Sequence, residues 1–311
     1  MSLLAVGTIA FDAIETPFGK VDKIIGGSAN YIAWSAGHFC KPVQISAVVG
    51  DDYPQSEVEQ LKHLGVDFSG LQVKEGQKSF FWSGKYDMNL NDRTTAQTDL
   101  NVLADFDPIL PPQYRSTDYV LLGNLTPEVQ LRVLNQMEKR PKLIAMDTMN
   151  YWIENDAYKP GLLEVLKRVD ILIINEEEAR MLGQDYSIVK CAKHILHTMG
   201  PTFVIVKKGE HGALLFHKKA AYFAPALPLE EVFDPTGAGD SFAGGFMGYI
   251  ACTNDISFEN LKRGVIYGSA MASFCVEKFG PQRLKELDMQ QIDRRIQEFV
   301  DLVQVDIVLQ D

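Results

Sequence analysis

The run Asp234-Pro235-Thr236-Gly237-Ala238-Gly239-Asp240 lies between a β-like segment, Glu231–Phe233, and an apolar helical segment, Ser241–Ala251. Small residues directly before a helix leave backbone N–H groups free to point at an anion, and the helix dipole adds positive potential there. A carboxylate in the same turn repels a phosphate, so Asp240 needs a task of its own, such as taking a proton from an attacking hydroxyl. The run therefore predicts a phosphoryl-transfer site with a built-in base.

The same run has a simpler interpretation. A Gly-x-Gly pattern before a helix is common as a tight turn with a capping Asp, and such a short pattern is weak evidence by itself. The rest of the chain has to decide between the two interpretations.

The bulk composition is that of an ordinary globular protein. With 311 residues, 46% of them hydrophobic, the chain can bury a sizeable core as one large α/β domain or as two modest ones. The motifs described below favour a single domain over residues 1–311. The net charge of −11 argues against a nucleic-acid partner, because phosphate backbones need a basic surface. A small anion such as ATP remains compatible with this charge, because local N–H groups and Mg²⁺ overcome a negative overall field.

The cysteines and the hydropathy pattern bear on location. Cys40, Cys191, Cys252 and Cys275 are far apart and form no Cys-x-x-Cys pair, which favours reduced thiols. No stretch approaches the roughly 18 apolar residues of a membrane span, and the N-terminus lacks a signal-peptide pattern. We therefore expect a cytoplasmic protein with no membrane partner.

Short apolar β-type runs alternate with amphipathic helical runs along most of the chain. The expected strands are Leu3–Gly7, Val43–Val49, Tyr119–Leu122, Leu143–Met146, Ile171–Ile174, Phe203–Val206 and Ala213–Phe216. The expected helices are Gln55–Leu64, Glu128–Glu138, Leu162–Arg168, Glu176–Leu182, Ile188–Met199, Phe258–Val276 and Met289–Val303. Strands that are apolar throughout are typical of a sheet covered on both faces, so the pattern predicts a doubly wound, mostly parallel α/β fold.

Two segments differ from this alternation. Residues 11–25 and 78–98 alternate polar and apolar side chains at period two, with no helix within either segment. We expect them to form a small sheet outside the main one, able to act as a lid that excludes water. A pair of hairpins with no role in the site is the alternative.

A set of short motifs occurs in a fixed order along the chain. The set consists of Gly7-x-x-x-x-Asp12, Gly26-Gly27, Val49-Gly50-Asp51-Asp52, Leu64-Gly65-Val66-Asp67, Asn175-x-x-Glu178, Lys208-Gly209-x-x-Gly212 and the Asp234–Asp240 run. In this order, and over nearly the whole length, the chain resembles the ribokinase-like (PfkB-type) family of carbohydrate and nucleoside kinases. The resemblance implies a doubly wound sheet with a small β-sheet lid.

The resemblance also implies roles for residues of the phosphate side. Asp240 corresponds to the catalytic base, and Gly237, Ala238 and Gly239 correspond to an anion hole whose N–H groups hold the transferring phosphoryl group. Asn175 and Glu178 correspond to the motif that organises Mg²⁺ and the ATP phosphates through water, although Asn175 is also a plausible plain helix N-cap.

Further implied positions surround the two substrates. Asp12 corresponds to the acid that binds sugar hydroxyls, and Gly26 and Gly27 correspond to a double glycine that lets the backbone approach the substrate. Gly209 and Gly212 correspond to the turn beneath the nucleotide, with an ordinary hairpin turn as the alternative. Thr236 is a candidate for nucleotide contact, and Asp234 and Thr236 correspond to a possible K⁺ site.

The chain departs from the family pattern at two places. Where relatives often carry Asn, this chain has Tyr31, and Asn30 comes one residue early, which on a helix rotates the side chain by about 100°. Where relatives often carry Thr, this chain has Lys207, followed by Lys208; either lysine is long enough to reach an ATP phosphate, and a solvated strand end is the alternative.

Tyr31 and the aromatic residues of the lid indicate which kind of molecule accepts the phosphoryl group. Tyr31 can stack on a flat ligand or hydrogen-bond to it, and Phe81 and Trp82 stand in an aromatic lid strand that is suited to clamping a nucleobase. At period two, Trp82 and Phe81 fall on opposite faces of that strand. Packing of these aromatics on the core or on a dimer mate is the alternative.

These observations favour ATP-dependent phosphorylation of a primary hydroxyl on a sugar-containing molecule, leaning to an adenosine-like ribonucleoside. A kinase for a simple sugar and a non-catalytic binding protein on the same fold stay open. A homodimer through the lid is also compatible with the lid aromatics. A dinucleotide-dependent oxidoreductase is disfavoured, because no Gly-x-Gly-x-x-Gly turn follows Leu3–Gly7.

Overall fold

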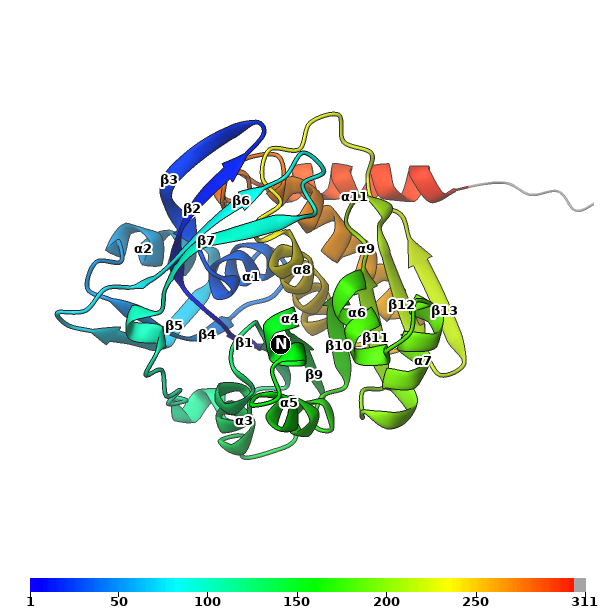
Figure 1. Ribbon diagram of the computed structural model, residues 1–311, viewed down its shortest axis with the longest axis horizontal. Helices are drawn as coiled ribbons and strands as arrows, with labels where there is room; N and C mark the ends of the chain where they lie inside the picture. The colour runs from blue at the N-terminus through cyan, green and yellow to red at the C-terminus, as the bar shows by residue number, and fades with distance from the viewer. Residues whose placement is uncertain (305–311) are drawn as a thin grey trace, which may run out of the picture.

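The computed structural model describes residues 1–304 and contains one large sheet with helices on both faces (Figure 1). The strand order in the large sheet is β13-β12-β11-β10-β9-β8-β1-β4-β5. Its strands are β1 (Leu3–Val6), β4 (Val43–Gly50), β5 (Val66–Lys74), β8 (Tyr119–Leu122), β9 (Leu143–Asp147), β10 (Ile171–Asn175), β11 (Phe203–Lys207), β12 (Ala213–His217) and β13 (Ala220–Ala224). Neighbouring strands from β5 to β11 are parallel, and β12 and β13 extend the edge antiparallel to their neighbours.

Helices cover the sheet on both sides, as the sequence predicts. They are α1 (Ser28–Ala36), α2 (Gln55–Leu64), α3 (Pro127–Asn135), α4 (Asn150–Glu154), α5 (Lys159–Leu166), α6 (Glu176–Gly183), α7 (Ile188–Thr198), α8 (Ala238–Thr253), α9 (Phe258–Cys275), α10 (Gln282–Lys285) and α11 (Met289–Val303). Alternate residues of β1 enter two separate cores: Leu3 and Ala5 pack with α1, α8 and α9, whereas Leu4 and Val6 pack with α3, α5 and α7. Burial on both faces, at about 1.5–3 kcal/mol for each large aliphatic side chain, explains why these strands are apolar throughout.

Helix α8, which begins inside the Asp234–Asp240 run, is held unusually close to its neighbours. A Cβ atom on Gly244 would lie 2.7 Å from the carbonyl oxygen of Ile32 in α1, and one on Gly245 would lie 2.9 Å from that of Tyr267 in α9. These contacts leave no room for a larger residue. The N-terminus of α8 therefore has a fixed position over the sheet.

The two period-two segments form the small separate sheet that the sequence predicts, named the lid sheet below. Each segment contributes an antiparallel hairpin, and the two hairpins pair in parallel through β2 and β6. Its strands are β2 (Ala10–Thr16), β3 (Gly19–Gly26), β6 (Phe80–Tyr86) and β7 (Arg93–Asp99), in the order β3-β2-β6-β7. The cyan β6–β7 hairpin and the blue β2–β3 hairpin lie together on one side of the main sheet (Figure 1).

Some expectations differ from the structure. The segment Glu231–Phe233 is not a strand, because the N–H of Phe233 donates to the carbonyl of Val276 in a loop instead of to a neighbouring strand. Strands β5 and β13 were not expected from the sequence. Among residues 1–304, no helix has both the length and the apolar character needed to cross a membrane.

Candidate active site

The carboxyl ends of three neighbouring strands bring polar side chains together. Asp147 ends β9, Asn175 ends β10 and Lys207 ends β11, and Asn175 and Lys207 are partners in the strand register. In an open parallel sheet this edge is where ligands bind. The N-terminus of α8, with Asp240 in its first turn, lies at the same edge. Asp240 is close enough to Asp147 and Lys207 for their charges to change its pKa.

The turn before α8 presents free backbone donors. Gly237 is the N-cap of α8 with φ of 77°, a left-handed conformation that suits glycine. The N–H of Ala238 donates to the carbonyl of Pro235 at 3.2 Å. The free donor that the sequence predicted at Ala238 is therefore already occupied. The N–H groups of Gly237, Gly239 and Asp240 have no hydrogen-bond partner within residues 1–304. These three free donors are suited to an anion, and the segment 237–240 is called the anion-binding turn below for this expected role.

Asp234 holds this turn in shape. Its side chain is fully buried, with one carboxylate oxygen accepting from the N–H of Thr236 at 2.8 Å and the other from the N–H of Gly280 at 2.9 Å. Asp234 therefore fixes the loop by hydrogen bonds to backbone. A K⁺ site at Asp234 and Thr236 stays a prediction.

Asn175 and Glu178 form a reciprocal cap at the start of α6. The side-chain oxygen of Asn175 accepts from the N–H of Glu178 at 2.8 Å, and Oε2 of Glu178 accepts from the N–H of Asn175 at 2.9 Å. The cap fixes both side chains at the sheet edge. Oε1 of Glu178 makes no hydrogen bond within the described chain and is the atom left for a ligand. No group of three or more Asp, Glu, His or Cys side chains in residues 1–304 is arranged to hold a metal ion.

Lys207, a candidate site residue from the sequence, forms an ion pair with Asp147, which the sequence did not single out. Lys207 Nζ lies 3.2 Å from Asp147 Oδ2, and the two side chains are 17% and 11% exposed. Lys208, in contrast, has Glu176 as its partner, at 3.6 Å. Asp147 was not among the expected site residues. Its signal was a carboxylate directly after an apolar strand, the same position that Asn175 occupies one strand away.

The carboxyl groups of the site have raised pKa values. Burial, with the charge of Asp147, raises the pKa of Asp240 to about 7, although Lys207 and Arg93 oppose the rise. Burial, again with Asp147, raises the pKa of Glu178 to about 7. Raised values of this kind are common where a carboxylate acts as a base, because a base works best near the ambient pH.

For Asp240 acting as the base that the sequence predicts, the raised pKa sets how activity depends on pH. A base must be deprotonated, so the active fraction of Asp240 falls as the pH drops through its pKa. We expect kcat/KM to rise with pH and to level off above about 7, where Asp240 is ionised. A pH profile from 5 to 9 checks this, and a profile that is flat between 6 and 8 would contradict it.

Asp12 lies in β2 against the double glycine. A Cβ atom on Gly26 would lie 1.9 Å from Asp12 Oδ2, so only glycine leaves room for this carboxylate. Gly27, the next residue, is the N-cap of α1 with φ of 89°. Burial, with the charges of Asp234 and Asp240, raises the pKa of Asp12 to about 8.

Asn30 and Tyr31, both candidates for substrate contact from the sequence, are buried in α1. The Asn30 amide donates to the carbonyl of Gly26 at 2.6 Å, and its oxygen accepts from the hydroxyl of Tyr53, so both ends are occupied. Tyr31 is only 1% exposed, and its ring packs against Gly237, where a Cβ would lie 2.3 Å away. Tyr31 therefore has no free face for stacking. Its hydroxyl is buried without a hydrogen-bond partner in the described chain.

The register of the lid sheet separates its two aromatic candidates. Trp82 is the strand partner of Asp12, so the two side chains share one face, whereas Phe81 is the partner of Phe11 on the other face. This confirms the opposite placement expected for Trp82 and Phe81, and Phe81 is not brought to the Asp12 side. Arg93 places its guanidinium 5.4 Å from the centre of the Trp82 ring.

The lid sheet touches the main body at both parts of the site. The hydroxyl of Thr236, next to the anion-binding turn, donates to the hydroxyl of Tyr86 in β6 at 3.1 Å. A Cβ on Gly209, in the β11–β12 hairpin, would lie 3.0 Å from Asn91 at the tip of the β6–β7 hairpin. Gly209 and Gly212 both belong to that β11–β12 turn, with positive φ. The lid sheet thus contacts the main body both next to the anion-binding turn and at the β11–β12 turn.

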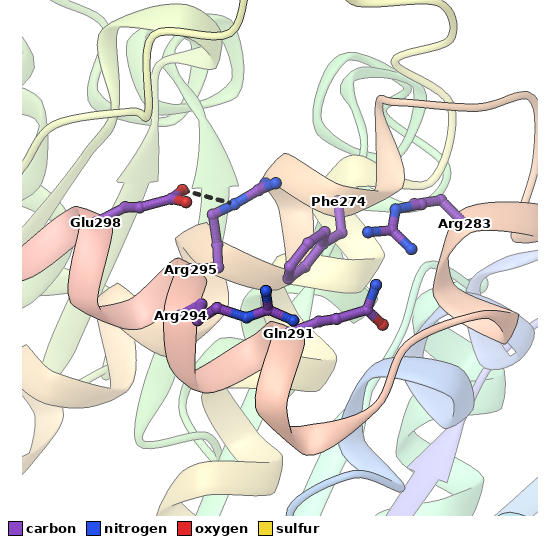
Figure 2. Close-up of a pocket in the computed structure, with 6 residues that line it drawn as sticks. All are labelled: Phe274, Arg283, Gln291, Arg294, Arg295 and Glu298. Carbon is purple, nitrogen blue, oxygen red and sulfur yellow. Dashed lines mark ion pairs between the residues drawn. The ribbon is translucent and has the colours of Figure 1, made fainter.

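A cavity of about 190 Å³ between α9 and α11 lies apart from these residues (Figure 2). Arg283 and Arg295 pack against the ring of Phe274 and both pair with Glu277, and Arg295 also pairs with Glu298. Since Arg283 and Arg295 already have carboxylate partners and none of the candidate site residues lines this cavity, it is a structural ion-pair network and not a second candidate site.

Comparison with known proteins agrees with this geometry. The family described as pfkB family carbohydrate kinase matches residues 2–287. The chain belongs to this family. It is 31% identical to the cytidine kinase of Thermococcus kodakarensis over 258 residues, which cover 79% of this chain and 87% of that protein. As a family member with kinase relatives, the chain is a sugar or nucleoside kinase.

Solved structures show the same fold. The nucleoside kinase of Methanocaldococcus jannaschii, an archaeal member of the ribokinase family, has a TM-score of 0.74 at 22% identity, covering 96% of this chain and 98% of its own. The Burkholderia thailandensis nucleoside kinase, solved in complex with inosine, has a TM-score of 0.73 at 20% identity, covering 95% of this chain and 97% of its own. The expected ribokinase-like fold is confirmed.

Proposed function

We propose that this kinase transfers the γ-phosphate of ATP to a primary hydroxyl of a ribonucleoside. One observation carries the choice of acceptor: Asp12 and Trp82 are strand partners on one face of the lid sheet. A carboxylate beside an indole ring suits a ligand with sugar hydroxyls at one end and a flat base at the other. The similarity to a cytidine kinase and to nucleoside kinases supports the same acceptor class.

On the donor side, the free N–H groups of Gly237, Gly239 and Asp240 bind the γ-phosphoryl oxygens. The phosphates lie over the carboxyl edge, between Gly209 of the β11–β12 turn and Lys207. Bound Mg²⁺ would neutralise phosphate charge, and Oε1 of Glu178 suits it because Mg²⁺ prefers oxygen ligands and keeps several of its waters. Since no group of three acidic side chains in the described chain is arranged as a metal site, a bound Mg²⁺ would need further oxygen ligands from phosphates and water.

On the acceptor side, Asp12 holds the sugar hydroxyls and Asp240 removes the proton of the primary hydroxyl. In the reaction, a bond forms between that oxygen and the γ-phosphorus while the bond from the γ-phosphorus to the bridging oxygen of ADP breaks. The hydroxyl proton passes to the Asp240 carboxylate. The lid sheet, held to Thr236 through Tyr86, keeps water from competing as the acceptor.

A binding screen tests the acceptor class. With a non-hydrolysable ATP analogue present, we expect cytidine, adenosine or inosine to raise the melting temperature more than ribose or fructose at equal concentration. A ligand at a hundred times its Kd adds about 2.7 kcal/mol to the free energy of unfolding, which a thermal-shift assay detects easily. A clear shift with ribose or fructose and none with any nucleoside would contradict a nucleoside acceptor.

A variant sharpens the same screen. Trp82→Ala removes the proposed base platform, and we expect it to weaken nucleoside binding by about 1–3 kcal/mol, the usual worth of base stacking on an aromatic side chain. Phe223→Ala removes an exposed aromatic ring, 53% accessible, from β13 of the main sheet and serves as the matched control. Equal nucleoside shifts in the Trp82 variant and in the control would remove the basis for the base platform.

A further inference from the structure

The ammonium group of Lys207 lies directly beside the anion-binding turn. A Cβ atom on Gly239 would lie 2.9 Å from Lys207 Nζ, closer than real Cβ atoms come to such a group. Gly239 also carries one of the free N–H groups of the turn. Any anion bound by that N–H therefore lies within reach of a full positive charge.

Asp147 holds this ammonium in place. Lys207 Nζ has Asp147 Oδ2 as a partner at 3.2 Å, and the charges of Glu178 and Asp240 also act on it. An unpaired ammonium at such a depth would be strongly destabilising, so the pair with Asp147 keeps Lys207 charged when no phosphate is bound.

We propose that Lys207 is a catalytic residue whose ammonium leaves Asp147 to bind an oxygen of the transferring phosphoryl group, and that Asp147 is the residue that positions it. The inference rests on the proposed function. It goes beyond that function because it adds a positively charged group, the ammonium of Lys207 at the end of β11, to the neutral N–H groups that bind the phosphoryl oxygens. Lysine suits the role because its ammonium is compact and fits beside Gly239.

The step keeps Lys207 protonated throughout. As the γ-phosphorus leaves the bridging oxygen of ADP and bonds to the acceptor oxygen, negative charge stays on its equatorial oxygens. The ammonium and the N–H of Gly239 bind those oxygens, and the acceptor proton goes to Asp240. When the product leaves, the ammonium returns to Asp147.

The first test compares two adjacent lysines. In Lys207→Met we expect kcat to fall by about 10²–10³-fold, the usual loss for a group that stabilises charge in the transition state, with KM for the acceptor little changed. Lys208→Met is the matched control, because Lys208 pairs with Glu176 and only Lys207 lies against Gly239. Lys207→Arg keeps the charge and is expected to recover at least part of the lost kcat. Binding of a non-hydrolysable ATP analogue reports that each variant is folded, and Lys207→Gln replaces the Met variant if that one is not.

The second test uses the pH profile, which a purely structural role would not move in this way. The groups that act on Asp240 are Asp147, which raises its pKa, and Lys207 and Arg93, which lower it. Lys207→Met should therefore move the rise of kcat/KM to higher pH, and Asp147→Asn should move it to lower pH. Shifts of opposite sign support the placement of both charges beside Asp240, and unmoved profiles would contradict it.

The outcomes separate this inference from the proposed function. If the native chain phosphorylates neither nucleosides nor sugars, the proposed function and the inference both fail. If the native chain is active and a folded Lys207→Met or Lys207→Gln variant keeps kcat within about threefold, the inference alone fails.

Discussion

Asp240→Asn is expected to lower kcat by about 10²–10⁴-fold, the usual contribution of a general base. The amide has nearly the same shape as the carboxylate but cannot accept the acceptor proton. The free N–H groups of Gly237 and Gly239 stay in place, so binding of the ATP analogue should persist. A coupled assay of ADP release gives kcat, and calorimetry gives the affinity for the analogue.

The control for this variant is Asp156→Asn, because Asp156 is exposed in the loop between α4 and α5. It should retain native kcat. Turnover of the Asp240 variant within a few fold of native would mean that proton removal by Asp240 does not limit the reaction, and the assignment of the base would fall.

Gly237→Ala is expected to disrupt the anion-binding turn. Gly237 has φ of 77°, which costs an alanine about 1–2 kcal/mol. The added Cβ would also lie 2.3 Å from the ring of Tyr31, which is buried and cannot move aside freely. The turn must shift, and its N–H groups then lose their alignment.

We expect this variant to lose about 10²–10³ in kcat, as when an oxyanion-hole donor is removed, and about 1–3 kcal/mol in the free energy of unfolding. Kinetics and denaturant unfolding measure the two effects separately. Gly161→Ala, in α5 and away from the site, is the matched control, since its Cβ would lie 3.1 Å from that of Pro127 and its helical position favours alanine. If Gly237→Ala keeps native kcat, the turn does not bind the phosphoryl group.

The main sheet was predictable because its signals are local. Strand β8 (Tyr119–Leu122) and helix α2 (Gln55–Leu64) have the bounds that the sequence predicts. A continuous apolar strand and a helix with a clear polar face each have a recognisable local pattern. Strand β5 was missed because it is half-buried and contains Gly70, so it shows neither a continuous apolar run nor a clean alternation. The segment Glu231–Phe233 was wrongly expected to be a strand, because apolar residues in a loop give the same short sequence pattern as a strand.

The site was predictable where a motif lies within a few residues and not where strands distant in sequence meet. Asp240 and the Asn175–Glu178 pair follow from short motifs. Asp147 gains its meaning only from Lys207, sixty positions away, because β9 and β11 flank β10 in the sheet. Tyr31 could not be placed by helical phase alone, because its burial depends on contact with Gly237, which is far along the chain.

The most direct measurement of the central claim is the product of a single competition reaction. The native protein, ATP and Mg²⁺ are incubated with cytidine, adenosine, inosine, ribose and fructose at equal concentrations, and mass spectrometry follows each phosphorylated product. The account predicts a nucleoside monophosphate phosphorylated at the primary hydroxyl as the main product, absent with Asp240→Asn. Ribose phosphate or fructose phosphate as the main product, with the nucleosides unchanged, would contradict it.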